Sequence, residues 1–218
     1  SHRAPAVWGE GLRRRISDWT QTAESVLAGT GSGLPSDAQV IGGVNRAATP
    51  DEIIVCAAGG LPGELHKLWR ASQVGGYHLE YGYSCMGYEI AGGLGVKMAH
   101  PDRAVTVMVG DGSYLMMNSE IATSVMLGLK LPIVVLNNGG IGGGIEKLPD
   151  DVKTIPPGIL SVGARYDLMM EAFGGVGVNV TSPADLTQAV NEAMDSGKPT
   201  LINAVIDENA GTESGRIG

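Results

Sequence analysis

The chain has 218 residues, a formal net charge of −8 and a pI near 4.9. Its length suffices for one sizeable domain, or for one domain with a tail. The acidic balance leaves no basic stripe to displace counterions from phosphates, so we expect no nucleic-acid partner. The one basic cluster, residues 13–15, is typical of a solvated helix face. No apolar run approaches the ~20 residues that span a bilayer, so no membrane association is expected either.

The N-terminus and the cysteines predict a cytoplasmic protein. No basic start followed by an apolar segment marks a signal peptide. Cys56 and Cys85 lie among apolar residues or glycines, so buried thiols are expected rather than a disulfide. Glycines number 34, and Phe173 is the one phenylalanine. This balance predicts a core of aliphatic residues and methionine, with many tight turns.

In chain order, the first predicted element is an amphipathic helix over residues 8–29. Apolar residues recur there three or four positions apart, in a stripe that needs another surface to bury against. The stripe consists of Trp8, Leu12, Ile16, Trp19, Ala23 and Val26. The next segment, residues 29–37 (GTGSGLPSD), has the composition of a flexible connector.

A second helix is predicted over residues 37–48. Ser36 is its candidate N-cap, and Pro50 marks its end. We therefore expect two parts in the chain. A lead-in helix with its linker occupies residues 1–35, and one domain occupies residues 36–218.

Strand-like and helix-like segments then alternate to the end of the domain. Apolar strand candidates occupy residues 53–58, 77–81, 104–110, 132–137, 176–180 and 200–207. Helical patterns fall in residues 62–70, 86–99, 118–129, 164–173 and 182–197. Several strands are continuous apolar runs, which suits parallel strands covered on both faces. The alternation predicts an α/β fold, a doubly wound and mainly parallel six-stranded sheet with helices on both faces.

An aspartate and an amide each follow one of these strands directly. Asp111 comes after the third strand, and Asn138 ends the Asn-Asn pair that closes the fourth. Ligands of such sheets gather outside the carboxyl ends of the strands, so the two side chains share one edge if the strands are neighbours. A carboxylate and an amide oxygen suit Mg²⁺, whose coordination is often completed by phosphate. Gly112 and Ser113 add a bare backbone and a hydroxyl that can donate hydrogen bonds to a diphosphate.

Gly-Asp-Gly at residues 110–112, followed by this Asn pair, resembles the cofactor motif of thiamine-diphosphate-dependent enzymes. In that family the motif carries Mg²⁺ and the diphosphate of the cofactor. The resemblance implies that Asp111 and Asn138 are side-chain ligands of the metal, and that Gly140 offers its backbone carbonyl. The residues implied to face the diphosphate are Gly110, Gly112 and Ser113.

Residues 84–95 (SCMGYEIAGGLG) carry a second likeness to the same family. They resemble the turn into the helix that precedes Gly-Asp-Gly, where an apolar side chain wedges between the two rings of the cofactor. Met86 stands at that position, and an unbranched, polarizable side chain suits it. The backbone of Ser84 stands where the amino group of the aminopyrimidine ring is held.

The likeness to particular members of the family changes along the chain. Residues up to about 137, above all 55–70 and 77–99, resemble trihydroxycyclohexanedione hydrolases, the ring-opening enzymes of inositol catabolism. Residues from about 139 to 218 resemble the C-terminal end of oxalyl-CoA decarboxylase and 2-hydroxyacyl-CoA lyase. The chain is therefore either a divergent member or an engineered hybrid of two relatives, and we favour the hybrid. The substrate stays open between a cyclic dione and an acyl-CoA thioester.

The resemblance also implies partners. Members of this type carry three domains, and the sequence matches the last of them, whereas the glutamate that activates the cofactor belongs to a pyrimidine-binding domain. Glu80, Glu89 and Glu120 cannot be assigned that role, although Glu80 ends a strand near the site and could touch cofactor or substrate. With a pyrimidine-binding domain in trans we expect cleavage of C–C bonds next to a carbonyl. Without it we expect little or no activity, and we expect a homo-oligomer.

Two alternatives remain open. The first is a minimal cofactor-binding module without turnover. The second is a Rossmann-type nucleotide binder, because residues 59–63 and 92–95 are glycine-rich. Neither segment has the full G-x-G-x-x-G spacing, and in the later glycine cluster Ile145 occupies the place of the last glycine.

Overall fold

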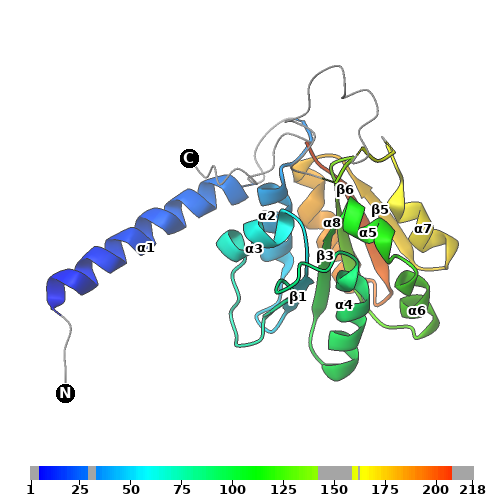
Figure 1. Ribbon diagram of the computed structural model, residues 1–218, viewed down its shortest axis with the longest axis horizontal. Helices are drawn as coiled ribbons and strands as arrows, with labels where there is room; N and C mark the ends of the chain where they lie inside the picture. Colours follow the sequence, from blue (N-terminus) through cyan, green and yellow to red (C-terminus); the bar gives the residue numbers. More distant parts are fainter. Residues whose placement is uncertain (1–4, 29–32, 142–158, 162, 208–218) are drawn as a thin grey trace.

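The structure is a computed structural model that describes residues 5–28, 33–141, 159–161 and 163–207. Its helices are α1 (Ala6–Leu27), α2 (Asp37–Ala47), α3 (Leu61–Leu68), α4 (Tyr88–Ala99), α5 (Asp111–Met116), α6 (Glu120–Met126), α7 (Tyr166–Ala172) and α8 (Pro183–Asp195). Its strands are β1 (Ile53–Cys56), β2 (Tyr77–Leu79), β3 (Val105–Gly110), β4 (Pro132–Asn137), β5 (Val176–Val180) and β6 (Thr200–Val205). Figure 1 shows a central sheet with helices on both sides, and α1 extending away from it.

The six strands form one sheet in the order β2-β1-β3-β4-β6-β5, and every pair is parallel. Each observed strand lies within the range predicted for it, and the doubly wound α/β fold is confirmed. Strands β3 and β4 are neighbours, with Gly110 opposite Leu136. The residues that follow these two strands therefore emerge side by side at one edge.

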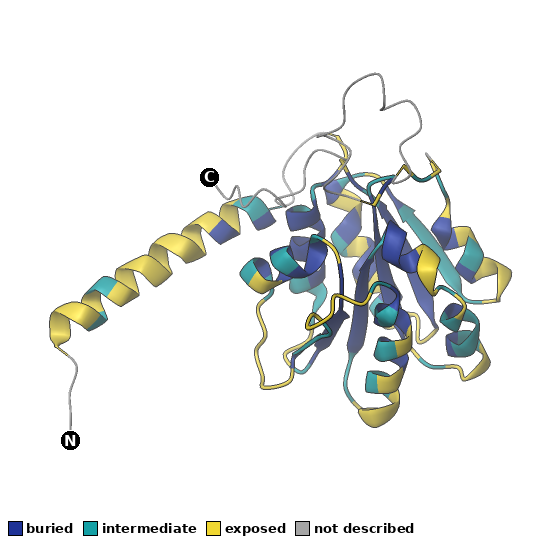
Figure 2. Ribbon diagram, in the orientation of Figure 1, coloured by how far each residue is buried: buried dark blue, intermediate teal, exposed yellow. Residues whose placement is uncertain are grey.

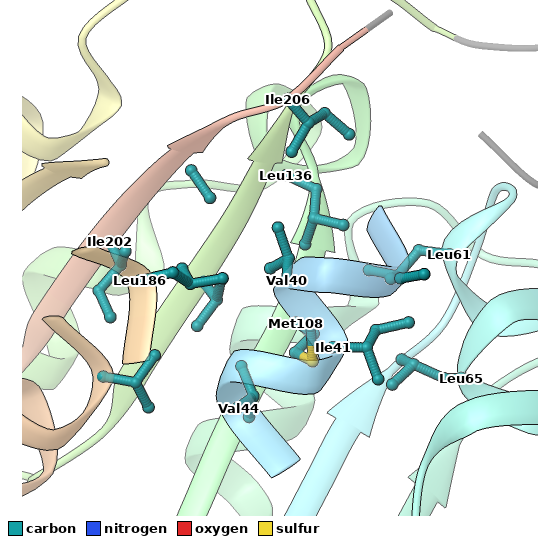
Figure 3. Packing of buried hydrophobic residues seen from close by; sticks show 14 of the residues in the cluster. Val40, Ile41, Val44, Leu61, Leu65, Met108, Leu136, Leu186, Ile202 and Ile206 are labelled. Atoms are coloured by element: carbon teal, nitrogen blue, oxygen red, sulfur yellow. The ribbon is translucent and has the colours of Figure 1, made fainter. Parts of the chain in front are cut away.

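Hydrophobic clusters cover both faces of the sheet, which explains the continuous apolar runs. Successive residues of β1 alternate between the clusters: Ile54 and Cys56 face one side, and Val55 faces the other. The first cluster lies under α2, α3 and α8, and Figure 3 shows Ile41 of α2 and Met108 of β3 within it. The second cluster lies under α4, α5, α6 and α7. Covering both faces fixes where each strand ends, and so where the edge residues stand.

Helix α5 is the element that the sequence did not predict. The pattern placed a helix over residues 118–129 and assigned no element to residues 111–117. In the structure a short helix begins at Asp111 itself, and the predicted helix is reduced to α6. Six residues are too few to display a helical period, but Tyr114 within them is fully buried against Tyr166. Tertiary packing stabilises α5 where propensity alone does not.

Helix α1 buries only the end of its predicted stripe. Ala23 and Leu27 pack against α2, where Gly42 permits close approach because a Cβ there would lie 2.1 Å from the Leu27 carbonyl oxygen. Arg46 donates a hydrogen bond to the same oxygen at 2.9 Å. Toward the N-terminus the stripe is exposed, as Figure 2 shows along most of the helix. The exposed residues of the stripe are Trp8, Leu12, Ile16 and Trp19.

The start of the domain follows the prediction in detail. Ser36 caps α2 in a reciprocal capping box, accepting the N–H of Gln39 at 3.2 Å while the Gln39 side chain accepts the Ser36 N–H at 3.0 Å. Part of the expected connector, residues 29–32, lies outside the described residues. The boundary at residue 35 stays a prediction. In the part of the chain that the structure describes, no helix is long and apolar enough to cross a membrane.

The cysteines differ from each other, which corrects one expectation. Both are free thiols, as predicted. Cys56 is buried in β1, whereas Cys85 is exposed. The difference arises because Cys85 lies in the turn between β2 and α4, outside both hydrophobic clusters.

Candidate functional site

The connections of the sheet diverge between β1 and β3. After β1 the chain passes to β2 on one side, and after β3 it passes to β4 on the other. In open α/β sheets a ligand crevice forms outside the carboxyl ends at such a point. Three segments border it: the loop at residues 57–60 after β1, the start of α4, and the start of α5. The predicted site residues are therefore at the expected edge.

Asp111 is the residue on which the loop after β4 converges. It begins α5 directly after β3, and only 1% of its surface is exposed. Its Oδ1 accepts the N–H of Gly112 at 2.8 Å. Its Oδ2 accepts the N–H groups of Gly139 at 2.8 Å and of Gly140 at 3.1 Å. One buried carboxylate thus joins the ends of two neighbouring strands.

The two asparagines after β4 have different surroundings. Asn138 is half-buried, and its Oδ1 accepts the N–H of Gly140 at 3.1 Å. Asp111 Oδ2 and Asn138 Oδ1 therefore lie within hydrogen-bond distance of the same nitrogen, so the structure brings together the two side chains predicted to share a metal ion. Asn137 is buried, and its amide donates to Asn203 Oδ1 of β6 at 3.1 Å. Asn137 therefore links two strands of the sheet, whereas Asn138 lies at the site.

The electrostatics and the donor set at this edge suit a hard cation. Burial raises the pKa of Asp111 to about 6, and the N–H donors of Gly112, Gly139 and Gly140 oppose that rise. A carboxylate removed from water gains from a cation beside it. A carboxylate, an amide oxygen and backbone carbonyls are ligands for Mg²⁺ rather than for zinc. No group of three His, Cys, Asp or Glu side chains suited to a metal is found among the described residues. The residues present fit Mg²⁺ with a phosphate-bearing ligand.

The three residues predicted to face a diphosphate are placed differently. A Cβ at Gly112 would lie 2.6 Å from Cγ1 of Ile141, so the loop after β4 packs directly on this backbone. A Cβ at Gly110 would meet nothing within 4 Å. The hydroxyl of Ser113 is buried and donates to both carboxylate oxygens of Glu89, at 2.8 and 2.7 Å. This arrangement leaves the backbone of Ser113, rather than its hydroxyl, available to a diphosphate.

The turn before α4 presents Ser84 and Met86 at the same edge. Ser84 is exposed and has a φ of 51°, a conformation that L residues rarely adopt. Met86 is half-buried. Glu80 accepts the N–H groups of Tyr83 at 3.4 Å and of Cys85 at 3.0 Å, and the hydrogen bond from Cys85 lowers the pKa of Glu80. Glu80 thus holds the residues on either side of Ser84, and backbone strain of the kind seen at Ser84 clusters at functional sites.

Glu89 is the residue at this site whose position the sequence did not indicate. It stands in the first turn of α4, 1% exposed, and contacts both Ser113 and the loop after β1. The available signal was a lone charged residue in an otherwise apolar and glycine-rich stretch, YEIAGGLG. Glu120, the third carboxylate considered, begins α6 and is half-buried.

A pocket of about 230 Å³ lies at the opposite edge, before β1. Asn45, Glu52 and Trp69 are among its lining residues, and hydrogen bonds within the chain already occupy each of them. Because ligands of parallel sheets bind at the carboxyl ends, this pocket is not a competing candidate.

Comparison with known proteins identifies the family. The family described as "Thiamine pyrophosphate enzyme, C-terminal TPP binding domain" matches residues 57–204. The chain belongs to this family. Thiamine pyrophosphate is another name for thiamine diphosphate, so the matched residues form a thiamine-diphosphate-binding domain of the kind named for thiamine pyrophosphate enzymes.

Relatives of this thiamine-diphosphate-binding domain include several named 3D-(3,5/4)-trihydroxycyclohexane-1,2-dione hydrolase. The protein of Bacillus licheniformis is 39% identical over 168 residues, which are 73% of this chain and 26% of the relative. That of Geobacillus thermodenitrificans is 46% identical over 138 residues, 63% of this chain and 20% of the relative. The chain thus spans about a quarter, or less, of the length of these relatives. The predicted resemblance to trihydroxycyclohexanedione hydrolases is confirmed.

A solved structure supports the fold. The thiamine diphosphate-dependent 4-hydroxybenzoylformate decarboxylase of Rhodococcus jostii RHA1 superposes with a TM-score of 0.72 over 84% of this chain and 34% of its own. The two sequences are 24% identical, so this likeness concerns the fold alone.

Proposed function

We propose that the domain binds thiamine diphosphate through Mg²⁺. Asp111 and Asn138 supply side-chain oxygens to the ion, and Gly140 supplies its backbone carbonyl. The observation that carries the proposal is the convergence of Asp111 Oδ2 and Asn138 Oδ1 on one nitrogen, at the carboxyl edge of neighbouring strands. Mg²⁺ keeps few protein ligands and binds phosphate oxygens, which matches this small set.

The remaining residues at this edge fit the rest of the cofactor. The backbones of Gly110, Gly112 and Ser113 lie beside the metal ligands and suit a diphosphate. Met86 and the backbone of Ser84 stand on the neighbouring turn and suit the two rings. Together, the turn before α4, the start of α5 and the start of the loop after β4 offer one binding surface.

We further propose that the chain is a domain of a lyase or ring-cleaving hydrolase. Thiamine diphosphate, when bound, provides the electron sink for breaking a C–C bond next to a carbonyl. The named relatives support a cyclic dione as the substrate class, while the likeness of residues 139–218 to acyl-CoA enzymes supports a thioester. Residues 142–158 and 208–218 fall outside the described residues, so the choice rests on sequence.

A pyrimidine-binding domain is the proposed partner, within a homo-oligomer. Both carboxylates near the turn are engaged in the chain itself: Glu80 holds the N–H groups of Tyr83 and Cys85, and Glu89 holds Ser113. Neither is free to activate a cofactor, so we expect little or no turnover when the chain is alone. Assays for decarboxylation and acyloin formation with a pyrimidine-binding domain added distinguish the lyase or hydrolase domain from the alternative, a binding module without turnover. Sustained turnover by the chain alone would exclude the binding-only module.

Calorimetric titration with thiamine diphosphate tests the binding proposal. We expect heat of binding with Mg²⁺ and little without it. Asp111→Ala should abolish binding, because it removes the only charged ligand proposed for the ion. Asp195→Ala, at the exposed end of α8, is the matched control and should bind as the parent does. Failure of the parent chain to bind would refute the function, and undiminished binding by Asp111→Ala would refute the metal site.

A further inference from the structure

We propose that Glu89 is a positioning residue that holds the two halves of the cofactor site in register. The inference rests on the proposed function, and it concerns how this chain prepares the site. Glu89 does not face the metal ligands directly. It connects the turn that carries Met86 to the segment that follows Asp111.

The contacts of Glu89 reach three separate segments. Its Oε1 accepts the N–H of Ala58 at 3.2 Å, in the loop after β1. Its Oε2 accepts the N–H of Gly87 at 3.0 Å, in the turn before α4. Ser113 of α5 donates its hydroxyl to both oxygens, and that hydroxyl oxygen also lies 2.7 Å from the Gly87 nitrogen. Glu89, Gly87, Ser113 and Ala58 form one buried cluster, the Glu89 clamp.

A helix cap alone does not account for this clamp. An acidic residue in the first turn of a helix is ordinarily stabilised by that helix and by water. Glu89 is 1% exposed, and its partners Ala58 and Ser113 belong to other elements. Burying a carboxylate is unfavourable unless several donors satisfy it, so the donors of all three segments must stay in place. The clamp therefore fixes the segments relative to one another.

The backbone around the clamp leaves little room for adjustment. Gly87 has a φ of 92°, and a Cβ there would lie 2.7 Å from Cγ of Met117 just past α5. The turn with Met86 is thus pressed against the end of α5, while Ser113 joins it to the start of α5. A ligand that contacts both Met86 and the backbone after Asp111 needs these two elements at a fixed spacing. A ligand that contacts only the metal segment, the residues around Asp111 and Asn138, does not need this fixed spacing.

This difference defines the experiment, which uses two probes on the 218-residue chain. Thiamine diphosphate with Mg²⁺ spans both elements, whereas inorganic pyrophosphate with Mg²⁺ reports on the metal segment alone. Glu89→Gln keeps the shape but turns an amide donor toward a backbone N–H, so one contact of the clamp is lost. We expect the Kd for thiamine diphosphate to rise about tenfold and the Kd for pyrophosphate to change less than about twofold.

Glu52→Gln is the matched control. Glu52 is also buried, at 4% exposure, and it also accepts a hydroxyl and a backbone N–H, but at the opposite edge of the sheet. It should leave both Kd values unchanged. Hydrogen exchange of the Gly87 amide gives a second readout, and it should quicken in Glu89→Gln but not in Glu52→Gln.

Ser113→Ala keeps the inference testable if Glu89→Gln does not fold. It removes the shared hydroxyl without changing charge, and it should shift the preference between the two probes in the same direction by a smaller factor. Equal weakening of both probes, or no weakening, in a folded variant would overturn the clamp. If the parent chain bound neither probe, the proposed function would fail and the clamp with it. If the parent bound both and Glu89→Gln matched it, the clamp alone would fail.

Discussion

Buried carboxylates stand at both edges of the parallel sheet, and they differ in what they hold. At the amino edge, Glu52 accepts the hydroxyl of Thr106 and the N–H of Thr49, three residues before it. At the carboxyl edge, Asp111 accepts N–H groups from its own helix and from the loop after β4, and Glu89 joins three segments. At the amino edge one carboxylate thus joins the segment before β1 to β3, whereas at the carboxyl edge two carboxylates join the loops after β1 and β4 to α4 and α5.

The comparison shows that burial of an acidic side chain does not by itself mark a site. Glu52 and Asp111 are almost equally buried, and burial raises the pKa of both. What distinguishes Asp111 is that its donors are glycine N–H groups, one of which, that of Gly140, also donates to the side-chain oxygen of Asn138. Glycine backbones can approach a ligand closely, whereas the donors to Glu52 belong to two threonines, Thr49 and Thr106. Four predictions follow from this contrast, in order of expected effect.

The largest effect concerns the pH dependence of stability in the cofactor-free protein. Asp111 has a pKa of about 6 in the folded state and an ordinary value of 3.8, so the folded chain holds this proton more tightly than the unfolded chain. Its contribution therefore destabilises the fold as pH rises from about 4 to about 6, by about 3 kcal/mol in total. Urea unfolding of the parent and of Asp111→Asn across this range isolates the contribution as a difference. A constant difference would contradict the raised pKa of this buried carboxylate.

The second prediction tests the amino edge. Glu52→Ala leaves the Thr106 hydroxyl and the Thr49 N–H without their acceptor, and should lower the free energy of unfolding by about 2 kcal/mol. Because these contacts are confined to the amino edge, the Kd for thiamine diphosphate with Mg²⁺ should not change. Denaturant unfolding and calorimetry on the same variant measure both quantities. A weakened Kd in a stably folded variant would mean that the two edges are coupled.

The third prediction returns to the carboxyl edge. Gly112→Ala places a Cβ against Ile141, which must move together with the loop that carries Gly139 and Gly140. We expect affinity for Mg²⁺ with pyrophosphate to fall about tenfold. Gly95→Ala is the control, since Gly95 is exposed within α4 and a Cβ there meets nothing within 4 Å. It should stabilise the protein by about 0.5–1 kcal/mol without affecting affinity, and equal losses in both variants would refute the close approach.

The smallest effect is expected at the start of the domain. Ser36→Ala removes one half of the capping box of α2 and should lower the free energy of unfolding by about 1 kcal/mol. Thermal unfolding followed by circular dichroism measures this change. Cofactor affinity should stay at the parent value, because Ser36 contacts Gln39 and no residue of the site. A free energy of unfolding unchanged from the parent would mean that the capping box does not stabilise the protein in solution.

The sequence predicted the strands better than the parts between them. Apolar runs such as that of β4 coincide with the structure because a strand covered on both faces must be apolar at every position. Helix α5 was not predicted because six residues cannot display a helical period of apolar residues. Its stability comes from Tyr114 packing against Tyr166. Ser113 was predicted to face a diphosphate with its hydroxyl, but the hydroxyl turns to Glu89. Its partner is 24 residues away, on an element whose position no local pattern encodes.

Composition and periodicity were sufficient to determine the fold class, and the spacing from Asp111 to Asn138 was sufficient to predict a divalent-ion site at one edge of the sheet. These properties are local, since each depends on which residues follow a strand and on how apolar the strand is. Only the tertiary structure decided which side chains lie together, placing Asp111 beside Asn138 and Glu89 beside Ser113. The reason is that these contacts depend on strand order and on helix packing across the sheet. Those arrangements arise from the whole core rather than from any one segment.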